Sequence, residues 1–206
     1  MTTAILLVRH ADVHNPEHVF YGRLPRFRIS ELGRRQAAFV RDYLADAPIA
    51  CFYTSPMLRA RATAEVLAEA HPGVPVRRAI ELTEVRTGWM GASNASLPAR
   101  INLYEPPHSQ DDETIAEVAR RVDRLIRRLA RRHAGQKVCC VSHGDPIVIA
   151  HALYKRLPLE LESIRMDWYP QKCSLTTLLF EAGASWPTVE YLDLIGQLAP
   201  ELKAPY

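Results

Sequence analysis

Short runs of apolar residues alternate along this chain with longer stretches in which apolar residues recur every three or four positions. The short runs are typical of strands buried on both faces, and the longer stretches are typical of amphipathic helices. This alternation predicts an α/β fold, in which crossover helices join the strands of one sheet. The predicted strands are Ala4–Val8, Ile49–Tyr53, Val74–Ile80, Lys137–Ser142, and a terminal pair formed by Leu175–Phe180 and Thr188–Leu194.

The clearest helical pattern covers Thr114–Arg132, where one face is apolar and the opposite face is rich in arginine. Acidic residues and core positions interleave with these arginines, so we interpret that face as a solvated surface and not as a nucleic-acid site. Ser30 is predicted to cap an earlier helix, and Ser55 followed by Pro56 is predicted to begin another. A further helix is expected over Ile147–Leu153.

The length of 206 residues fits one domain, residues 1–206, with no repeat, low-complexity stretch or linker to divide it. A proline-rich stretch at Tyr104–His108 is expected to form an excursion over one end of the sheet. The net charge of +3 arises from 26 basic and 23 acidic side chains. This balance disfavours nucleic acid as a partner, although it still allows a local cationic pocket.

The apolar run near the amino end, Ala4–Val8, is too short for a signal-peptide core, and no later run is long enough to span a membrane. The four cysteines include no CxxC pair and stand inside apolar runs. Such cysteines are typical of small buried side chains in a reducing compartment. We therefore expect a cytoplasmic protein with no membrane partner, and the sequence leaves a homodimer open.

Polar and charged side chains follow four of the predicted strands, at the point where each strand ends. Arg9 and His10 follow the first strand, Arg59 lies shortly after the second, Glu84 after the third and His143 after the fourth. Each residue alone is explained as readily by packing, an ion pair or a turn. Ligands of open α/β sheets bind outside the carboxyl ends of the strands, so together the four positions predict one shared site.

The blocks that contain these residues resemble the histidine phosphatase superfamily, also called the phosphoglycerate mutase-like family. The resemblance covers roughly residues 4 to 150, and its four blocks are Arg9-His10-Ala11, Ser55–Ala64, Leu82–Glu84 followed by Gly88–Gly91, and Ser142-His143-Gly144. One block alone would be weak, whereas four in the same order are highly specific. The resemblance implies a three-layer sandwich with a mostly parallel central sheet and helices on both faces.

The resemblance also implies roles for individual residues. His10 would be the nucleophile and Glu84 the proton donor and base, while phosphate would be bound by Arg9, Arg59, His143 and Gly144. Arginine forks suit phosphate oxygens, and an imidazole that attacks phosphorus forms a phosphohistidine, so this chemistry requires no metal and no cofactor. The substrate side of the pocket would be lined by Asn15, Tyr21, Gly22 and Arg23, although turn chemistry explains Tyr21 and Gly22 equally well.

Three positions depart from the family pattern. Ala11 stands in place of a glycine, Val13 stands where many members carry serine or threonine, and Met90 replaces a glutamate. Alanine disfavours positive φ and therefore constrains the loop beside the predicted nucleophile. We expect the catalytic geometry to survive these changes.

Three functions remain to be compared. The leading one is a metal-independent phosphatase acting on a small phosphorylated metabolite. The first alternative is a cofactor-dependent phosphoglycerate mutase, and the second is a non-catalytic phosphate-binding or regulatory module. Only about 60 residues separate Glu84 from His143, which leaves little chain to cover the pocket, and an open pocket favours hydrolysis.

Overall fold

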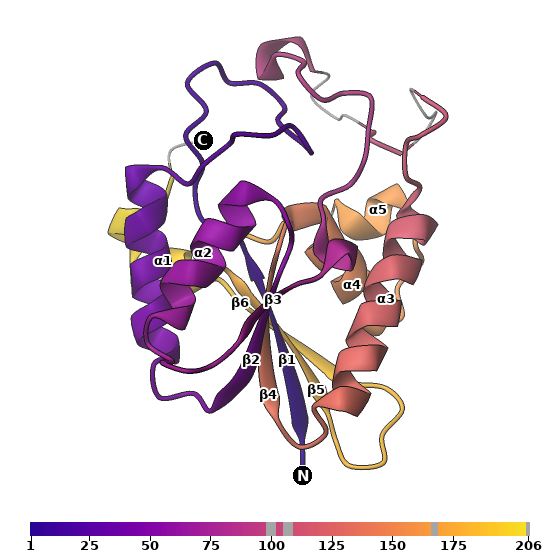
Figure 1. Cartoon of the computed structure of the whole chain (residues 1–206). Helices are drawn as coiled ribbons and strands as arrows, with labels where there is room; N and C mark the ends of the chain where they lie inside the picture. The colour runs from indigo at the N-terminus through magenta and orange to yellow at the C-terminus, as the bar shows by residue number, and fades with distance from the viewer. Residues whose placement is uncertain (98–101, 105–108, 166–168, 205–206) are drawn as a thin grey trace.

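The computed structural model describes residues 1–97, 102–104, 109–165 and 169–204. Its centre is a six-stranded sheet in the order β3-β2-β4-β1-β5-β6 (Figure 1). The first four strands in that order run parallel, and β5 is antiparallel to both of its neighbours. The strands are β1 Thr3–Arg9, β2 Ile49–Thr54, β3 Val76–Arg78, β4 Lys137–Ser142, β5 Leu175–Phe180 and β6 Thr188–Leu192.

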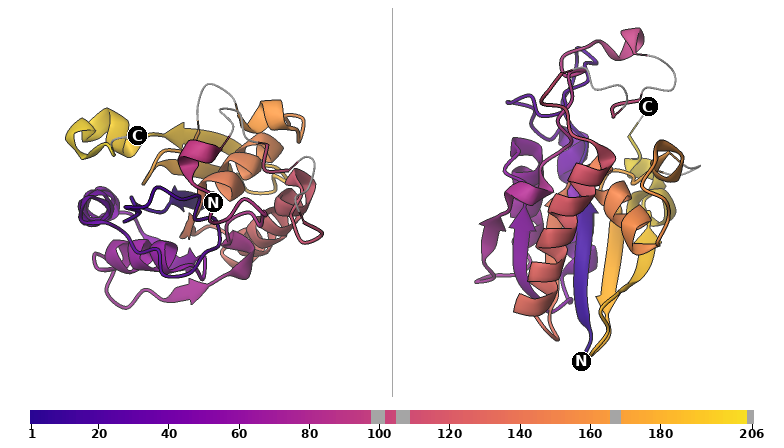
Figure 2. Two further views of the ribbon diagram at one scale, coloured as in Figure 1. Left: turned by 90° about the horizontal axis from the view of Figure 1, so that it is seen from above. Right: turned by 90° about the vertical axis from the view of Figure 1, so that its right-hand side faces the viewer.

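Helices lie on both faces of this sheet, with α1 and α2 on one face and α3 and α4 on the other (Figures 1 and 2). None of the described helices is long and apolar enough to cross a membrane. The helices are α1 Glu31–Leu44, α2 Leu58–Ala68, α3 Ile115–Arg132, α4 Gly144–Tyr154, α5 Leu161–Ile164 and α6 Leu194–Leu198.

The central strand β1 divides the apolar core into two clusters. Successive side chains of a strand point to opposite faces of its sheet. Ile5 and Leu7 therefore pack with α3 and α4, whereas Leu6 and Val8 pack with α1 and α2. This arrangement confirms the predicted α/β fold: a mostly parallel sheet forms the middle layer and helices form the layers on either side.

The helix ends confirm the predicted Ser30 cap and correct the prediction for Ser55. The Ser30 hydroxyl accepts from the Gly33 amide at 2.9 Å at the start of α1. Thr114 and Glu117 form a reciprocal capping box at the start of α3. The prediction that Ser55 begins the next helix is wrong, because α2 begins at Leu58. The Ser55 hydroxyl instead pairs with a histidine of the site described below.

Three other predicted boundaries shift in the structure. Strand β6 ends at Leu192 and not at Leu194, which is the first residue of α6. Only Val76–Arg78 of the predicted third strand pairs, as an exposed edge strand, and the chain then turns into a short 3-10 helix over Ile80–Leu82. Helix α4 begins at Gly144, three residues earlier than predicted. In the proline-rich stretch, Tyr104 is buried, and residues 105–108 lie outside the described part of the chain.

All four cysteines are buried and free, as the sequence predicted: Cys51, Cys139, Cys140 and Cys173. Burial penalises the thiolate, and it raises the pKa of Cys139 and of Cys173 to about 12. These side chains are therefore small apolar parts of the core.

Candidate active site

The pairing of β1 with β4 places two histidines next to each other at the carboxyl end of the sheet. Arg9, the last residue of β1, lies beside Ser142, the last residue of β4. The amide of the next residue, His10, donates to the Ser142 carbonyl oxygen at 2.9 Å. His10 and His143 consequently face each other, with ring centroids 5.0 Å apart. The strand register thus produces the convergence that the sequence predicted.

The imidazole of His10 is held in one tautomer. Its Nε2 lies 3.1 Å from Arg59 Nε, which can only donate, so Nε2 is the acceptor and carries the lone pair. Its Nδ1 then carries the proton and donates to the carbonyl oxygen of Ala11 at 2.8 Å. Burial, followed by the positive charges of Lys172 and Arg59, holds the pKa of His10 well below its usual value. His10 is therefore a neutral imidazole whose unprotonated nitrogen, Nε2, is paired with Arg59 in this structure.

The guanidinium of Arg59 is completely buried and fixed by the loop that follows β1. Its Nη2 donates to the carbonyl oxygen of Gly22 at 2.7 Å, and its carbon lies 4.7 Å above the Tyr21 ring. Gly22 has φ +37, and a Cβ there would meet Met90 Cγ at 2.7 Å, so only glycine fits. The predicted substrate loop thus positions a cation next to His10.

Ala11, which stands where the family pattern has glycine, adopts an ordinary negative φ. The backbone here therefore does not need the conformational freedom of glycine. Its side chain is fully buried, and its amide donates to the Thr63 hydroxyl at 3.1 Å. The carbonyl oxygen of Ala11 meanwhile accepts the His10 proton. Alanine is therefore compatible with the conformation beside His10.

Arg9 lies at the end of β1 with part of its hydrogen-bonding capacity unused. Its Nη1 donates to the carbonyl oxygen of Pro170 at 2.6 Å, and its carbon lies 5.0 Å above the Tyr169 ring. Its Nε is buried and has no hydrogen-bond partner in the described part of the chain. A buried N–H donor without an acceptor destabilises the folded protein. The oxygen of a bound anion could accept this hydrogen bond, so the position of Arg9 suits anion binding.

His143 stands at the N-cap position of α4. Its Nε2 pairs with the Ser55 hydroxyl at 2.8 Å, which explains why Ser55 does not cap a helix. Its Nδ1 is buried and, among the described residues, has no partner. Burial and then Arg59 hold the pKa of His143 well below its usual value. The following Gly144 has no room for a side chain, because a Cβ there would overlap the Tyr169 hydroxyl.

Glu84 tends to keep its proton, whereas His10 and His143 tend to lose theirs. Burial, followed by the negative charge of Asp145, raises its pKa to about 7, although Arg59 and Arg9 oppose this shift. One carboxylate oxygen accepts from the Val85 amide at 2.9 Å. Near neutral pH a substantial share of Glu84 therefore carries a proton that it can give to a substrate.

Two residues that the sequence placed on the substrate side are engaged elsewhere. Arg23 donates to the backbone carbonyl of Glu84 at 2.6 Å and forms an ion pair with Glu113 at 2.6 Å. The Asn15 amide bonds both the carbonyl oxygen and the amide of Val19. Neither side chain lines the cavity of the site, so Arg23 braces the Glu84 segment and Asn15 braces its own loop.

Beside these residues is a cavity of about 490 Å³, large enough for a small phosphorylated molecule. Tyr21 and Gly22 line it, as the sequence predicted, together with Arg9 and Glu84. The remaining lining residues are Val19, Phe20, Asn94, Leu103, Asp145, Arg165 and Tyr169. Among the predicted phosphate-binding and proton-donating groups, Arg9 and Glu84 therefore border this space, whereas His10, Arg59 and His143 are buried and are not among its lining residues.

The sequence analysis missed three residues of this region. Asp145 directly follows the Ser142-His143-Gly144 block, and its carboxylate accepts from the Tyr169 hydroxyl at 2.7 Å. Lys172 reaches the Tyr21 hydroxyl at 2.9 Å. The position of Asp145 beside a motif was a usable signal, whereas no local pattern marks the other two. Among the described residues, no group of three or more His, Cys, Asp or Glu side chains is arranged to hold a metal ion.

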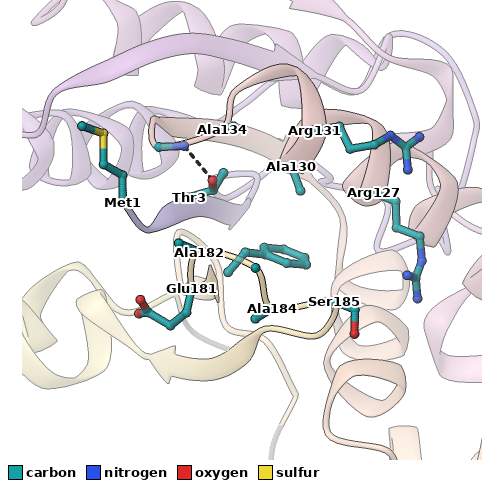
Figure 3. Close-up of a pocket in the computed structure, with 13 residues that line it drawn as sticks. Met1, Thr3, Arg127, Ala130, Arg131, Ala134, Glu181, Ala182, Ala184 and Ser185 are labelled. Atoms are coloured by element: carbon teal, nitrogen blue, oxygen red, sulfur yellow. Dashed lines mark hydrogen bonds between the residues drawn. The ribbon is translucent and has the colours of Figure 1, made fainter.

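A larger cavity, of about 570 Å³, lies away from these groups, next to the amino end of β1 (Figure 3). Its wall is formed mainly by small residues of the α3 end and of the turn between β5 and β6. Arg127, which borders it, is paired with Asp123 at 2.8 Å, and Glu181 accepts from the Thr2 hydroxyl. This cavity therefore lacks the combination of nucleophile, cations and acid found at the other end of the sheet.

Comparison with known proteins shows the family of this chain. Residues 5–192 match the family model of the histidine phosphatase superfamily (branch 1). Phosphoserine phosphatase 1 of Hydrogenobacter thermophilus is 30% identical over 153 residues, which cover 69% of this chain and 72% of that protein.

Two solved structures share the fold. The mycobacterial glucosyl-3-phosphoglycerate phosphatase has a TM-score of 0.76 and 23% identity, over 93% of this chain and 97% of that one. The phosphoserine phosphatase of Entamoeba histolytica, solved with 3-phosphoglyceric acid, has a TM-score of 0.76 and 22% identity, over 92% and 96% of the two chains. The chain therefore belongs to the histidine phosphatase superfamily (branch 1), and it is an enzyme, a phosphatase.

Proposed function

We propose that this protein hydrolyses small phosphomonoesters without a metal ion, through a phosphohistidine formed on His10. The observation that carries the proposal is the state of His10: a neutral imidazole whose Nε2 lone pair lies among the donors of Arg59 and His143. A nucleophile must be unprotonated, and a phosphate dianion must meet positive charge. Both conditions are supported by the same cluster of side chains.

In the first step, His10 Nε2 attacks phosphorus and the bond from phosphorus to the ester oxygen breaks. The leaving oxygen takes the proton of the Glu84 carboxyl group, so an alcohol departs and not an alkoxide. Arg9 and Arg59 stabilise the charge on the phosphoryl oxygens, with a further donor from His143. The amide of Gly144, at the start of α4, adds to this positive environment.

In the second step, water attacks the phosphorus of phosphohistidine. The Glu84 carboxylate accepts a proton from that water, and the bond between Nε2 and phosphorus breaks. Inorganic phosphate leaves, and both His10 and Glu84 return to their starting protonation states. A carboxyl group with a pKa of about 7 suits both steps, because its two forms are both populated near neutral pH.

Hydrolysis is favoured over the mutase alternative by the names of the similar proteins, which are phosphatases of phosphoserine and of glucosyl-3-phosphoglycerate. The retention of His10, Arg59, Glu84 and His143 in one cluster likewise argues against a module that only binds phosphate. The substrate class that we propose is a small phosphorylated metabolite, with no nucleic-acid or membrane partner.

The proposal is tested by phosphate release from 4-nitrophenyl phosphate and from a panel of phosphorylated metabolites, all in the presence of a chelator. We expect turnover by the wild-type protein and none by His10→Ala. The matched control is His14→Ala, which removes an imidazole of the same loop that no role in the reaction requires. Full activity in His10→Ala would refute the mechanism, and isomerisation of monophosphoglycerates that outpaces phosphate release would favour the mutase.

A further inference from the structure

Lys172 precedes β5, and the backbone next to it is tied to the start of the catalytic loop. The Cys173 amide donates to the Arg9 carbonyl oxygen at 3.0 Å, and the Arg9 amide donates to the Ser174 carbonyl oxygen at 3.2 Å. These two bonds fix residues 173 and 174 against the residue that precedes His10. The position of Lys172 relative to the site is thus set by backbone pairing.

The ammonium group of Lys172, whose side chain is partly buried, makes few hydrogen bonds. Its Nζ donates to the Tyr21 hydroxyl at 2.9 Å, and this is its one hydrogen bond within the described residues. An ammonium has three N–H donors, and a neutral hydroxyl does not compensate for the loss of water. Burial, and then the nearby charge of Arg9, lower the pKa of Lys172. Such a cation is suited to an anion that binds beside it.

Arg59 and His10 contact the same tyrosine as Lys172. The Arg59 guanidinium lies 4.7 Å from the centre of the Tyr21 ring, and Lys172 Nζ lies 5.7 Å from it. The His10 ring meets Tyr21 edge-on, with centroids 6.4 Å apart. Lys172 is therefore a neighbour of both the nucleophile and a phosphate-binding arginine, although it belongs to none of the motifs.

We propose that Lys172 is a further phosphate-binding residue, which donates to an oxygen of the transferring phosphoryl group beside Arg9 and Arg59. The inference rests on the proposed function, since it assigns a ligand to the same site. A transition state that spreads charge over the equatorial phosphoryl oxygens is stabilised by each positioned cation. The Tyr21 hydroxyl keeps the flexible lysine side chain in place, which lowers the entropy lost on binding.

The experiment compares Lys172→Met and Lys172→Gln with Lys155→Met, which removes an exposed lysine at the end of α4 and serves as the matched control. Binding of inorganic phosphate is measured by calorimetry, and kcat/KM is measured with 4-nitrophenyl phosphate. We expect both Lys172 variants to bind phosphate about tenfold or more weakly, and to lose about 10²-fold in kcat/KM. Lys172→Arg should restore part of both losses, and Lys155→Met should change neither.

A pH profile separates a role in the site from a role in folding. The charged and titratable groups that act on His10 or contact its ring are Arg9, Arg59, His143, Tyr21 and Lys172. Lys172 is the first of the charges that lower the pKa of His10, so its removal should raise that pKa. The acid limb of kcat/KM should therefore move to higher pH in both neutral variants, and should stay in place in Lys155→Met.

The outcomes are decisive in either direction. Unchanged phosphate affinity and an unchanged acid limb in folded Lys172 variants would overturn the inference, as would loss of activity that follows loss of thermal stability alone. If the wild-type protein binds phosphate through Lys172 but releases none from any substrate, the inference holds and the proposed hydrolysis fails. If hydrolysis occurs without any dependence on Lys172, the proposed hydrolysis holds and the inference about Lys172 fails.

Discussion

At the scale of single residues, the surroundings of His10 favour its unprotonated form, and the surroundings of Glu84 favour its protonated form. His10 lies among cations and in a buried place, and both effects favour its neutral form. Glu84 is also buried, but its neighbour Asp145 carries negative charge, so its neutral form is favoured as well. A nucleophile without a proton and an acid with one are therefore available at the same pH.

Replacement of the acid should reveal how much the leaving group needs a proton. We expect Glu84→Gln to lower kcat by about 10²- to 10⁴-fold for alkyl phosphates, because glutamine cannot transfer a proton. The loss should be much smaller for 4-nitrophenyl phosphate, whose phenolate departs readily without one. The measurement is steady-state kinetics on both substrates, with Glu81→Gln, a nearby carboxylate paired with Arg128, as the control.

The pH dependence of the wild-type protein follows from the same group. Because the pKa of Glu84 is raised to about 7, the proton needed by an alkyl leaving group is lost as the pH rises through that value. The rate of phosphorylation by alkyl phosphates should fall over this range. A basic limb that persists unchanged in Glu84→Gln would show that another group controls it.

Several side chains that converge at the carboxyl end of the sheet were predictable from the sequence, whereas Asn15 and Arg23, predicted on the substrate side, have partners elsewhere. His10, Arg9, Arg59, Glu84 and His143 each follow a strand, so their convergence follows from topology. The directions of Asn15 and Arg23 depend instead on which partners a folded loop offers them. Those partners, the Val19 backbone and Glu113, are recognisable only in three dimensions.

At the scale of elements, α3 contributes more than an apolar face to the site. Arg121 was interpreted as part of a solvated surface, yet its side chain is only 14% exposed and pairs with Glu113 at 2.8 Å. It also donates to the backbone carbonyls of Glu81 and Glu84, at 2.6 Å and 3.3 Å. The helix thereby holds the segment that presents the acid, together with Arg23 of the substrate loop.

Removal of this brace should affect both stability and catalysis. We expect Arg121→Met to lower the free energy of unfolding by about 2 kcal/mol, because it removes one donor from the Glu113 carboxylate and from the backbone carbonyls of Glu81 and Glu84. A displaced Glu84 should lower kcat by about tenfold for alkyl phosphates. Denaturant unfolding and kinetics test the two effects.

The control for this change is Arg124→Met, which removes an exposed arginine of the same helix. It should leave both quantities close to their wild-type values. Equal behaviour of the two variants would mean that Arg121 is, after all, an ordinary surface residue.

The order and kinds of the elements were predictable because apolar periodicity reports burial directly. The exact boundaries of the elements were less predictable. The edge strand β3 extends only over Val76–Arg78, since it pairs with a neighbouring strand on one side alone. Ser55 illustrates a different limit. Its sequence context is that of a helix cap, but the buried His143 competes for its hydroxyl, and a local pattern contains no information about that competitor.

At the scale of the whole molecule, the sheet separates two apolar clusters that contain all four cysteines. Their burial predicts that native protein is inert toward a thiol reagent such as Ellman's reagent, because neither the reagent nor the thiolate is accommodated there. We expect no fast labelling before denaturation and four labelled thiols after it. Fast native labelling that accompanies loss of activity would contradict this description of the core.

The register of β1 with β4 has a consequence for how such an enzyme diversifies. Insertion of a single residue into β1 would exchange the side chains between the two clusters and turn His10 away from His143, so the strands cannot change in length. The connection from β1 to α1 beyond Arg23, and the described part of that from β3 to α3 beyond Glu84, are not held by strand register and lie over the carboxyl end of the sheet (Figure 1). We therefore expect substrate preference to change through these parts of the connections, while the strands keep His10 beside His143.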